Sequence, residues 1–358
     1  MRRKSTILVL LIAMFTLAAC GPEPTPTPAP PTPTTGQAAA DTPTTEAMAE
    51  TPTTMVEESP TAAETPTTAA AGETPTAAPT VPPVDAEEAF NKVKARGRLI
   101  VGVKFDQPLF GLLNQDTNQP EGFDVDMGRA VAERLFGDPN AVQFEEAISR
   151  NRIPYLDEER VDVVFATMTA NETRAQQILF SDCYYVAGQS LLVPTGSDIQ
   201  SVDDLAGKTV GTVKGSTSEQ NIRKFAPEAT VELFDGYAQA VEAMDAGRVQ
   251  AVTTDDIILY GFERQNPDKY EVVGGQFTKE PYAAGLKRGN TLLLDEVNAT
   301  IREMKQNGEW AALYEKWIGQ APAEVPPQDW RDVYAAAGTP AAGTPASGTP
   351  QATGTPTP

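Results

Sequence analysis

Four cationic side chains stand where the sequence predicts that a strand ends or a helix begins: Lys104, Arg150, Arg152 and Arg174. Guanidinium and ammonium groups at such places can hold a carboxylate through charge-assisted hydrogen bonds. The ordinary alternative for each of them is a solvated position on the surface. Arg174 is the strongest of the four, because it follows a predicted helix start by one turn.

One acidic side chain complements these cations. Asp255 directly follows the apolar run A-V-T-T and could hold an ammonium group. The alternative is that Asp255 caps the helix I-I-L-Y-G-F that comes next. Asp124 and Asp126 stand at the start of another helical run and are interpreted as its caps.

Two short sequences have the pattern of a capping box, T-A-N-E at 169–172 and S-T-S-E at 216–219. Each follows a strand-like run, so each would leave spare backbone N–H groups at the carboxyl end of a strand, where anions bind. Plain helix capping remains open for each. Their matched placement in the two halves of the chain favours an anion site. The sequence A-G-K-T at 206–209 is not a phosphate loop, because the required glycine five positions before Lys208 is missing.

Composition excludes several classes of function. Histidine is absent from the chain, which excludes Ser-His-Asp and Cys-His catalysis and H-E-x-x-H metal sites. The formal net charge of −21 argues against a nucleic-acid partner, which needs a basic face. The two cysteines are Cys20 and Cys183, and if Cys20 carries a lipid then Cys183 has no disulfide partner. We therefore expect no metal, no cofactor and no enzymatic activity.

Both ends of the chain predict segments outside the fold. Residues 1–20 have a basic tip, an apolar stretch and small residues before Cys20, which indicates an export signal. The ending L-A-A-C-G resembles the bacterial lipoprotein signal, in which the cysteine is lipidated; an ordinary secretory peptide is the alternative. Residues 21–84 are rich in Pro, Thr and Ala and predict a disordered stalk. Residues 321–358, with A-G-T-P repeats toward the end, predict a disordered tail.

Between these segments, strand-like runs alternate with helical ones. The strand-like run 98–105 precedes the helical run 124–136, and the pattern restarts after 189–196. Such alternation is typical of α/β units on mostly parallel sheets. The stretch 291–319 predicts two helices broken at Asn307-Gly308. Ligands of α/β folds gather at the carboxyl ends of strands, which is where the cations described above stand.

A set of motifs in this region resembles family 3 of the extracellular solute-binding proteins, the polar amino-acid receptors of ABC importers. The motifs are I-V-G-V-K-F-D-Q-P, E-G-F-D-V-D, N-R-I-P, A-T-M-T with Arg174 following, F-S-D-C-Y-Y-V-A-G-Q-S-L-L-V and V-K-G-S-T-S-E. They follow the family's order over 90–319. Within the family, the chain most resembles the glutamate-binding and glutamate/aspartate-binding members, mainly through the motifs V-G-V-K-F-D-Q-P and S-x-N-R-I-P.

The resemblance implies a type II periplasmic-binding-protein fold, in which two α/β lobes joined by two hinge strands close on the ligand. Lobe 1 would comprise 85–193 and 281–320, and lobe 2 would comprise 194–280.

The resemblance also implies a binding site for an amino acid. In similar proteins the arginine at the position of Arg174 binds the α-carboxylate, helped by the residues at Thr167 and Thr169. The aspartate matching Asp255 takes the α-ammonium group. Thr217 would contribute from lobe 2.

A second group would meet the ligand's side chain. In members that bind acidic amino acids, the positions of Ser149 and Arg152 meet the side-chain carboxylate. Lys104 occupies a ligand-facing position, whereas Arg150 is expected to face solvent. Asn171 departs from the threonine that many relatives carry there.

Together these features predict a monomeric, lipid-anchored receptor outside the cytoplasm that delivers glutamate to an ABC permease in the membrane. Three alternatives stay open. The ligand could be glutamine or another polar amino acid, the protein could be a sensor, or the same fold could support an enzyme.

Overall fold

The structure, a computed structural model, describes residues 85–338, and all of them belong to one unit. The predicted signal peptide 1–20 with Cys20, the predicted stalk 21–84 and the chain beyond residue 338 lie outside the described residues. Among the residues described, no helix is both long and apolar enough to cross a membrane.

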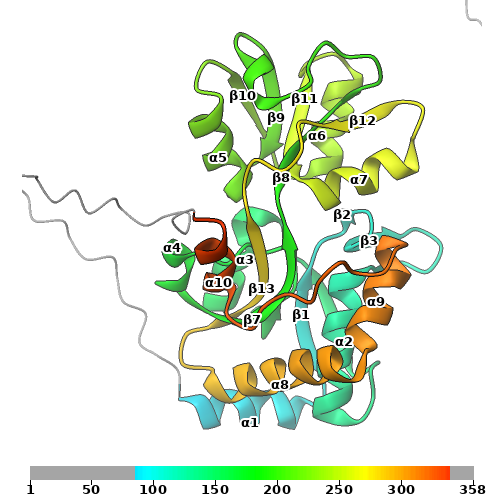
Figure 1. Cartoon of the computed structure of the whole chain (residues 1–358). Helices are drawn as coiled ribbons and strands as arrows, with labels where there is room; N and C mark the ends of the chain where they lie inside the picture. Colours follow the sequence, from blue (N-terminus) through cyan, green and yellow to red (C-terminus); the bar gives the residue numbers. More distant parts are fainter. Residues whose placement is uncertain (1–84, 339–358) are drawn as a thin grey trace, which may run out of the picture. The chain divides into compact units, whose positions relative to one another are not determined.

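The first of two large sheets has the strand order β5-β1-β6-β13-β7 (Figure 1). The strands are β1 Leu99–Val103, β5 Val142–Glu146, β6 Val163–Val164, β7 Ile178–Ala187 and β13 Glu280–Lys287. β1 pairs in parallel with β5 and β6, whereas β13 runs antiparallel to β6 and β7. A small antiparallel sheet follows β1 and contains β2 Asp106–Gln107, β3 Gly111–Asn114 and β4 Gln119–Glu121.

Helices accompany this first sheet. They are α1 Ala86–Arg96, α2 Phe123–Phe136, α3 Arg152–Asp157, α4 Glu172–Ala175, α8 Thr291–Asn307, α9 Glu309–Ile318 and the 3-10 turn Ser149–Asn151. The break between α8 and α9 falls at Gly308, whose φ of 90° is a left-handed value that glycine adopts without strain. The prediction of two helices broken at Asn307-Gly308 is confirmed. We call the first sheet and its helices lobe 1, residues 85–187 and 280–338.

The second large sheet has the order β10-β9-β11-β8-β12. Its strands are β8 Gln189–Pro194, β9 Thr209–Val213, β10 Thr230–Phe234, β11 Ala251–Asp255 and β12 Tyr270–Val273, and its helices are α5 Thr217–Phe225, α6 Tyr237–Asp245, α7 Asp256–Gln265 and the 3-10 turn Val202–Leu205. β9 pairs in parallel with β10 and β11, and β8 runs antiparallel to β11 and β12. We call this part lobe 2, residues 189–279.

The chain crosses between the two sheets twice (Figure 1). The first crossing is at Gly188, between β7 and β8, and the second leads from β12 into β13. Gln189 already pairs with Asp255 in the second sheet, so the predicted boundary at 193/194 is too late by several residues. The second predicted boundary, at 280/281, falls one residue after the start of β13 at Glu280. A boundary inside one long apolar run cannot be located from hydrophobicity alone.

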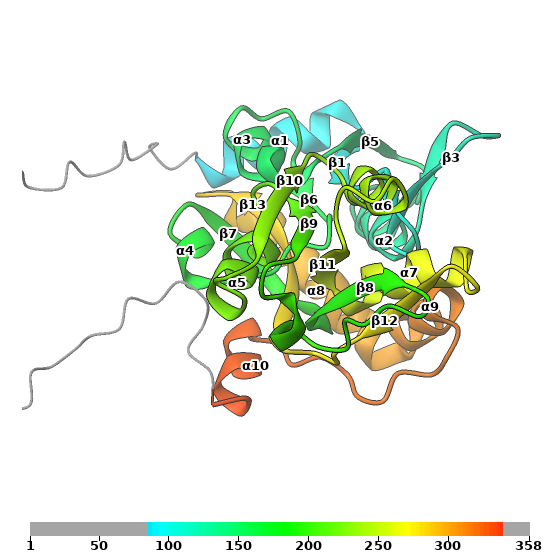
Figure 2. The same cartoon turned by 90° about the horizontal axis from the view of Figure 1, so that it is seen from above.

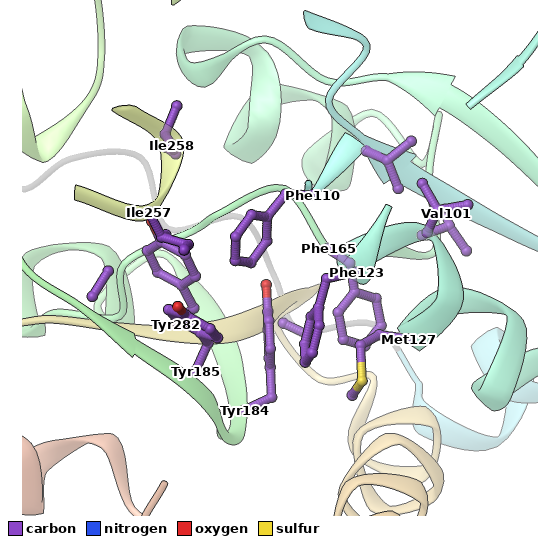
Figure 3. Packing of buried hydrophobic residues seen from close by; sticks show 14 of the residues in the cluster. Val101, Phe110, Phe123, Met127, Phe165, Tyr184, Tyr185, Ile257, Ile258 and Tyr282 are labelled. Atoms are coloured by element: carbon purple, nitrogen blue, oxygen red, sulfur yellow. The ribbon is translucent and has the colours of Figure 1, made fainter. Parts of the chain in front are cut away.

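Aromatic side chains fill the core near the crossings (Figure 3). The rings of Phe110 and Tyr185 meet edge to face with centroids 5.2 Å apart, and Tyr185 stacks on Tyr282 at 5.6 Å. Ile257 and Ile258 of α7 belong to the same cluster, so the core continues from lobe 1 into lobe 2. Burying a ring of this size stabilises the fold by about 1.5–3 kcal/mol.

The predicted disorder of 321–358 is wrong for residues 321–338. These residues lie along lobe 1 and end in the helix α10, Trp330–Ala336. Trp330, Val333 and Tyr334 are buried in a cluster with Cys183, and Asp329 caps the helix by accepting a hydrogen bond from the N–H of Arg331. Three apolar residues at helical spacing and an N-cap outweigh the Pro and Ala content on which the prediction depended.

Candidate functional site

The predicted site residues lie together where the two lobes meet. Lys104, Ser149, Thr167 and Thr169 follow strands of lobe 1, whereas Thr217 follows β9 of lobe 2. The hydroxyl oxygens of Thr169 and Thr217 are 3.3 Å apart across the two lobes. The carboxyl ends of strands from both sheets therefore form one polar cluster.

Arg174 connects the two lobes. Its Nη1 donates to the carbonyl of Thr169 at 2.7 Å, and its Nη2 donates to the carbonyl of Gly215 in lobe 2 at 3.2 Å. The N-cap of the short helix α4 is Asn171, whose Oδ1 accepts from the N–H of Arg174 at 2.9 Å. The prediction that Thr169 is the cap is wrong, because Thr169 is bridged to Tyr282 of β13 as an extended residue.

The second predicted capping box, at 216–219, is confirmed for its N-cap residue. Ser216 is the N-cap of α5, and its hydroxyl accepts from the N–H of Glu219 at 3.1 Å. The reciprocal bond differs from the pattern, since Glu219 accepts from the N–H of Gly215 at 3.0 Å. Thr217, at the first position of α5, is thereby fixed at the border with lobe 1.

Arg152 and Lys104 are two buried cations. Their exposed fractions are 3% and 2%. Arg152 donates only to backbone carbonyls, those of Ser149 at 3.2 Å, Ala166 at 2.9 Å and Thr167 at 3.2 Å. The Nζ of Lys104 donates to the hydroxyl of Ser149 at 2.9 Å. Neither cation has an acidic partner within 4.0 Å among the residues that the structure describes.

Burial controls the charge of this pair. Burial, together with the positive charge of Arg152, lowers the pKa of Lys104 to about 7. Burial also lowers the pKa of Arg152 to about 9, with a contribution from Arg174. Like charges brought together without water destabilise one another, so a cluster of this kind favours an anion.

Asp124 lies close enough to the two cations for their charges to act on its carboxylate, and it is not a helix cap, contrary to prediction. The N-cap of α2 is Gly122, and the fully buried Asp124 accepts from the hydroxyl of Tyr184 and the N–H of Thr167, each at 2.7 Å. Burial raises its pKa to about 7. Its bond to the N–H of Thr167 holds the turn at this residue, which adopts a positive φ of 45°. Asp126 is likewise not a cap, since it accepts from Lys316 and Trp317 of α9.

Asp255 is a buried carboxylate on the side of lobe 2. Its Oδ2 accepts from the hydroxyl of Tyr282 at 2.5 Å, whereas its Oδ1 is buried without a hydrogen-bond partner. Asp255 is the N-cap residue of α7 by position, but its side chain makes no capping bond. Burial raises its pKa well above the ordinary value, and the nearby Glu280 raises it further. A cation placed at Oδ1 would stabilise the charged form.

Glu280, at the start of β13, extends this acidic region. It is 1% exposed and accepts from Thr217 at 2.8 Å, Asn221 at 2.9 Å and Thr278 at 2.8 Å. These three bonds satisfy the carboxylate and fix Thr217 in place.

Sequence reasoning missed four residues of the site: Gln107, Asn221, Glu280 and Tyr282. Gln107 is fully buried, accepts from the hydroxyl of Thr167 at 2.8 Å and leaves its Nε2 without a partner. It stands inside the motif V-G-V-K-F-D-Q-P, which could have drawn attention to it. The others lie in an ordinary helix and an ordinary strand, and nothing in those segments marks them.

Arg150 is exposed, in agreement with the prediction that it faces solvent, and it also contacts lobe 2. Its side chain is 38% exposed and forms an ion pair with Asp235 of lobe 2. Beside this pair, Asp106 of lobe 1 accepts from the N–H of Tyr237 at the start of α6, at 2.7 Å. The N-cap of α6 is Gly236, which has no side chain that could accept from the N–H groups of the first turn. The carboxylate of Asp106 accepts from one of them instead. A Cβ on Gly236 would lie 2.5 Å from Asp106 Oδ2, so a larger residue would have to displace this carboxylate.

The lobes therefore meet in a closed arrangement. A pocket of about 360 Å³ opens at its edge and is lined by Ser149, Arg150, Ile153, Met168, Arg174, Lys214, Gly215 and Glu219. Within residues 85–338, no group of acidic or cysteine side chains is arranged to hold a metal ion. The arrangement can hold a small zwitterion, since cations gather in lobe 1 and buried carboxylates gather near β11 and β13.

Comparison with known proteins gives consistent results. Residues 99–320 match the model of the bacterial extracellular solute-binding proteins, family 3. The ABC transporter glutamine-binding protein GlnH of Bacillus subtilis is 45% identical over 233 residues, 65% of this chain and 85% of that protein. The glutamate-binding protein GluB of Corynebacterium efficiens is 32% identical over 235 residues, 63% of this chain and 80% of that protein. A solved structure of an ancestral arginine-binding protein bound to glutamine aligns with a TM-score of 0.59 and 39% identity, covering 63% of this chain and 99% of that one.

Proposed function

Because the chain belongs to family 3 of the bacterial extracellular solute-binding proteins, whose members here are amino-acid receptors of ABC transporters, we propose that it binds glutamate between its two lobes and delivers it to a permease. Its fold is the type II periplasmic-binding-protein fold of its structural neighbours, with two α/β lobes and two crossing strands.

The observation that carries the choice of glutamate is the pair of buried cations, Lys104 and Arg152, without an acidic partner within 4.0 Å among the described residues. A side-chain carboxylate placed between them would complete two charge-assisted contacts. A carboxamide has nearly the same shape but would leave both charges buried and unpaired, which costs several kcal/mol.

The other site residues suit the α-carboxylate and the α-ammonium group, which all amino acids share. Arg174, at the lobe border, would bind the α-carboxylate, assisted by Thr169 and the start of α5 at Thr217. The Oδ1 of Asp255 is a buried acceptor without a hydrogen-bond partner. The α-ammonium group of the ligand would donate to it and so satisfy it. Thr167 and Ser149 would complete the contacts of lobe 1.

Glutamine is the second candidate ligand. The relative with 45% identity is named for binding glutamine, whereas the relative named for glutamate is 32% identical. The Nε2 of Gln107 is a buried donor without a partner, and it suits a carboxamide oxygen and a carboxylate oxygen equally. The higher sequence identity to the glutamine-binding relative favours glutamine. The buried cations Lys104 and Arg152 favour glutamate instead.

Calorimetry of the full mature chain with glutamate, aspartate and glutamine decides between them. We expect glutamate to bind more tightly than glutamine by at least about 2 kcal/mol, which is roughly thirtyfold in affinity. The variant Arg152→Met should reduce that preference mainly by weakening glutamate. Equal affinities in the native protein, or tighter binding of glutamine, would reject glutamate as the ligand and leave the family assignment intact.

We also propose that the protein is a monomer held outside the cytoplasm by a lipid on Cys20, a residue outside those that the structure describes. Several acyl chains give stable membrane attachment, whereas a single chain gives marginal binding. The variant Cys20→Ala should release the protein from cells. Attachment as firm as that of the native protein would reject the lipid anchor. An enzyme on this fold would instead turn over its ligand, and product analysis after incubation with amino acids would reveal that activity.

A further inference from the structure

The segment 321–338 lies beyond the part of the chain that matches the family, which ends at residue 320. It nevertheless has a defined place on lobe 1. Figure 1 shows α10 in red beside α4 and β13, and Figure 2 shows α10 from above. α10 contacts both β7 and β13, the two strands that lead to lobe 2.

The segment is attached to β7 by polar bonds, several of them partly buried. The carbonyl of Gln328 accepts from the N–H of Cys183 at 2.8 Å. The ammonium group of Lys305 donates to the carbonyls of Cys183 at 2.6 Å, Pro326 at 2.9 Å and Pro327 at 3.3 Å. A single cation thus joins the segment to the strand. Trp330 is 3% exposed and meets Phe180 edge to face at 6.0 Å.

α10 also contacts the loop that carries two of the site residues. The hydroxyl of Tyr334 donates to the carbonyl of Ala170 at 2.9 Å. The N–H of Ala170 donates to the carbonyl of Pro281 at 2.8 Å, so this residue is held between β13 and α10. The exposed Arg331 forms an ion pair with Glu172 at 2.7 Å. Both contacts fall between Thr169 and Arg174.

The loop 169–174 therefore has two sides. Thr169 and Arg174 reach toward lobe 2, as their contacts with Thr217 and Gly215 show. Residues between them contact α10 instead. Since Arg174 Nη1 bonds the carbonyl of Thr169, a shift of the peptide at Ala170 would move the guanidinium group. A misplacement of this kind weakens binding, because each contact depends on a fixed geometry.

We propose that α10 is a built-in support of the binding site, and that Tyr334 is a positioning residue that holds the loop 169–174 in the geometry that binds an α-carboxylate. This inference rests on the proposed function, because it assumes that Arg174 binds the ligand. Tyr334 lies close enough to Glu280 and Arg174 for their charges to affect the pKa of its hydroxyl group, which agrees with its place behind the site.

The variant Tyr334→Phe tests the proposal, since it keeps the ring and removes only the hydroxyl group. Losing one hydrogen bond of this type should weaken glutamate and glutamine equally, by about three- to tenfold. The ratio of the two affinities should stay unchanged, because both ligands share the α-carboxylate. The matched control is Tyr270→Phe, in which a ring that is 3% exposed loses a bond to Asp245 at 2.8 Å inside lobe 2. We expect native affinity for this control.

Hydrogen exchange of the ligand-free variants gives a second readout that needs no ligand. Amides of 169–175 should exchange faster in Tyr334→Phe than in the native protein, and Tyr270→Phe should leave them unchanged. Native affinity in Tyr334→Phe would overturn the proposal and reduce α10 to a cover of the apolar cluster around Cys183. Unchanged exchange in 169–175 would overturn it as well. If the native protein bound no amino acid, the proposed function would fail separately, and exchange alone would decide whether α10 holds the loop.

Discussion

The preference for glutamate over glutamine should depend on pH through Lys104. Without a ligand, burial lowers the pKa of Lys104 to about 7, and a neutral carboxamide would bring no charge to raise it. A carboxylate at the same place raises that pKa toward the ordinary value of about 10.4. Between these two values the glutamate complex holds one more proton than the glutamine complex.

Linkage then fixes the sign and the size of the effect. The complex that holds more protons is weakened more as pH rises. The ratio of the glutamate affinity to the glutamine affinity should therefore fall by about tenfold per pH unit above pH 7, and be nearly flat just below it. Asp124 acts in the same direction. Its pKa, raised by burial to about 7, would rise further beside a second carboxylate. The α-ammonium group is common to both ligands and cancels in the ratio.

Calorimetry with both ligands at pH 6.5, 7.5 and 8.5 measures the ratio, and buffers of different ionisation enthalpy count the protons. Lys104→Met is the control, since its ratio should fall less steeply with pH than the ratio of the native protein, and Asp124 accounts for any slope that remains. A ratio that stays constant in the native protein between pH 7.5 and 8.5 would refute the reasoning. An unchanged slope in Lys104→Met would refute the role of Lys104 and assign the slope to Asp124.

Three further predictions follow from the site. Arg174→Ala should weaken every amino-acid ligand together, by on the order of 2–5 kcal/mol in calorimetry, and near-native affinity would exclude it from the site. Asp255→Asn should weaken glutamate more than glutarate, which lacks the α-amino group; equal losses would contradict the ammonium role. Gly236→Ala should hinder closure, because the added Cβ would lie 2.5 Å from Asp106 Oδ2, and small-angle scattering with saturating glutamate should then show a more extended protein. A radius of gyration equal to that of the native complex would count against the closed contact.

Some features could be predicted because they are local. The break at Asn307-Gly308 depends on one glycine with a left-handed backbone, and the cap at Ser216 depends on a hydroxyl three residues from an N–H group. The alternation of strand-like and helical runs was enough to indicate an α/β fold. Local rules failed where a distant strand competed. Thr169 fits a capping box but is bridged to Tyr282, more than a hundred residues away in the chain.

The sequence by itself determined the class of the fold, the exclusion of histidine chemistry and the positions of cations at strand ends. Only the tertiary structure decided which cations are buried: Arg152 is enclosed, whereas Arg150 next to its segment pairs with Asp235 at the surface. It also decided that Glu280 and Tyr282 lie beside Thr217 and Asp255, and that α10 contacts the segment 169–174. The physical reason is that burial and pairing depend on segments brought together from far apart in the chain. Desolvation, which sets the charge of Lys104 and Asp255, exists only once those segments have met.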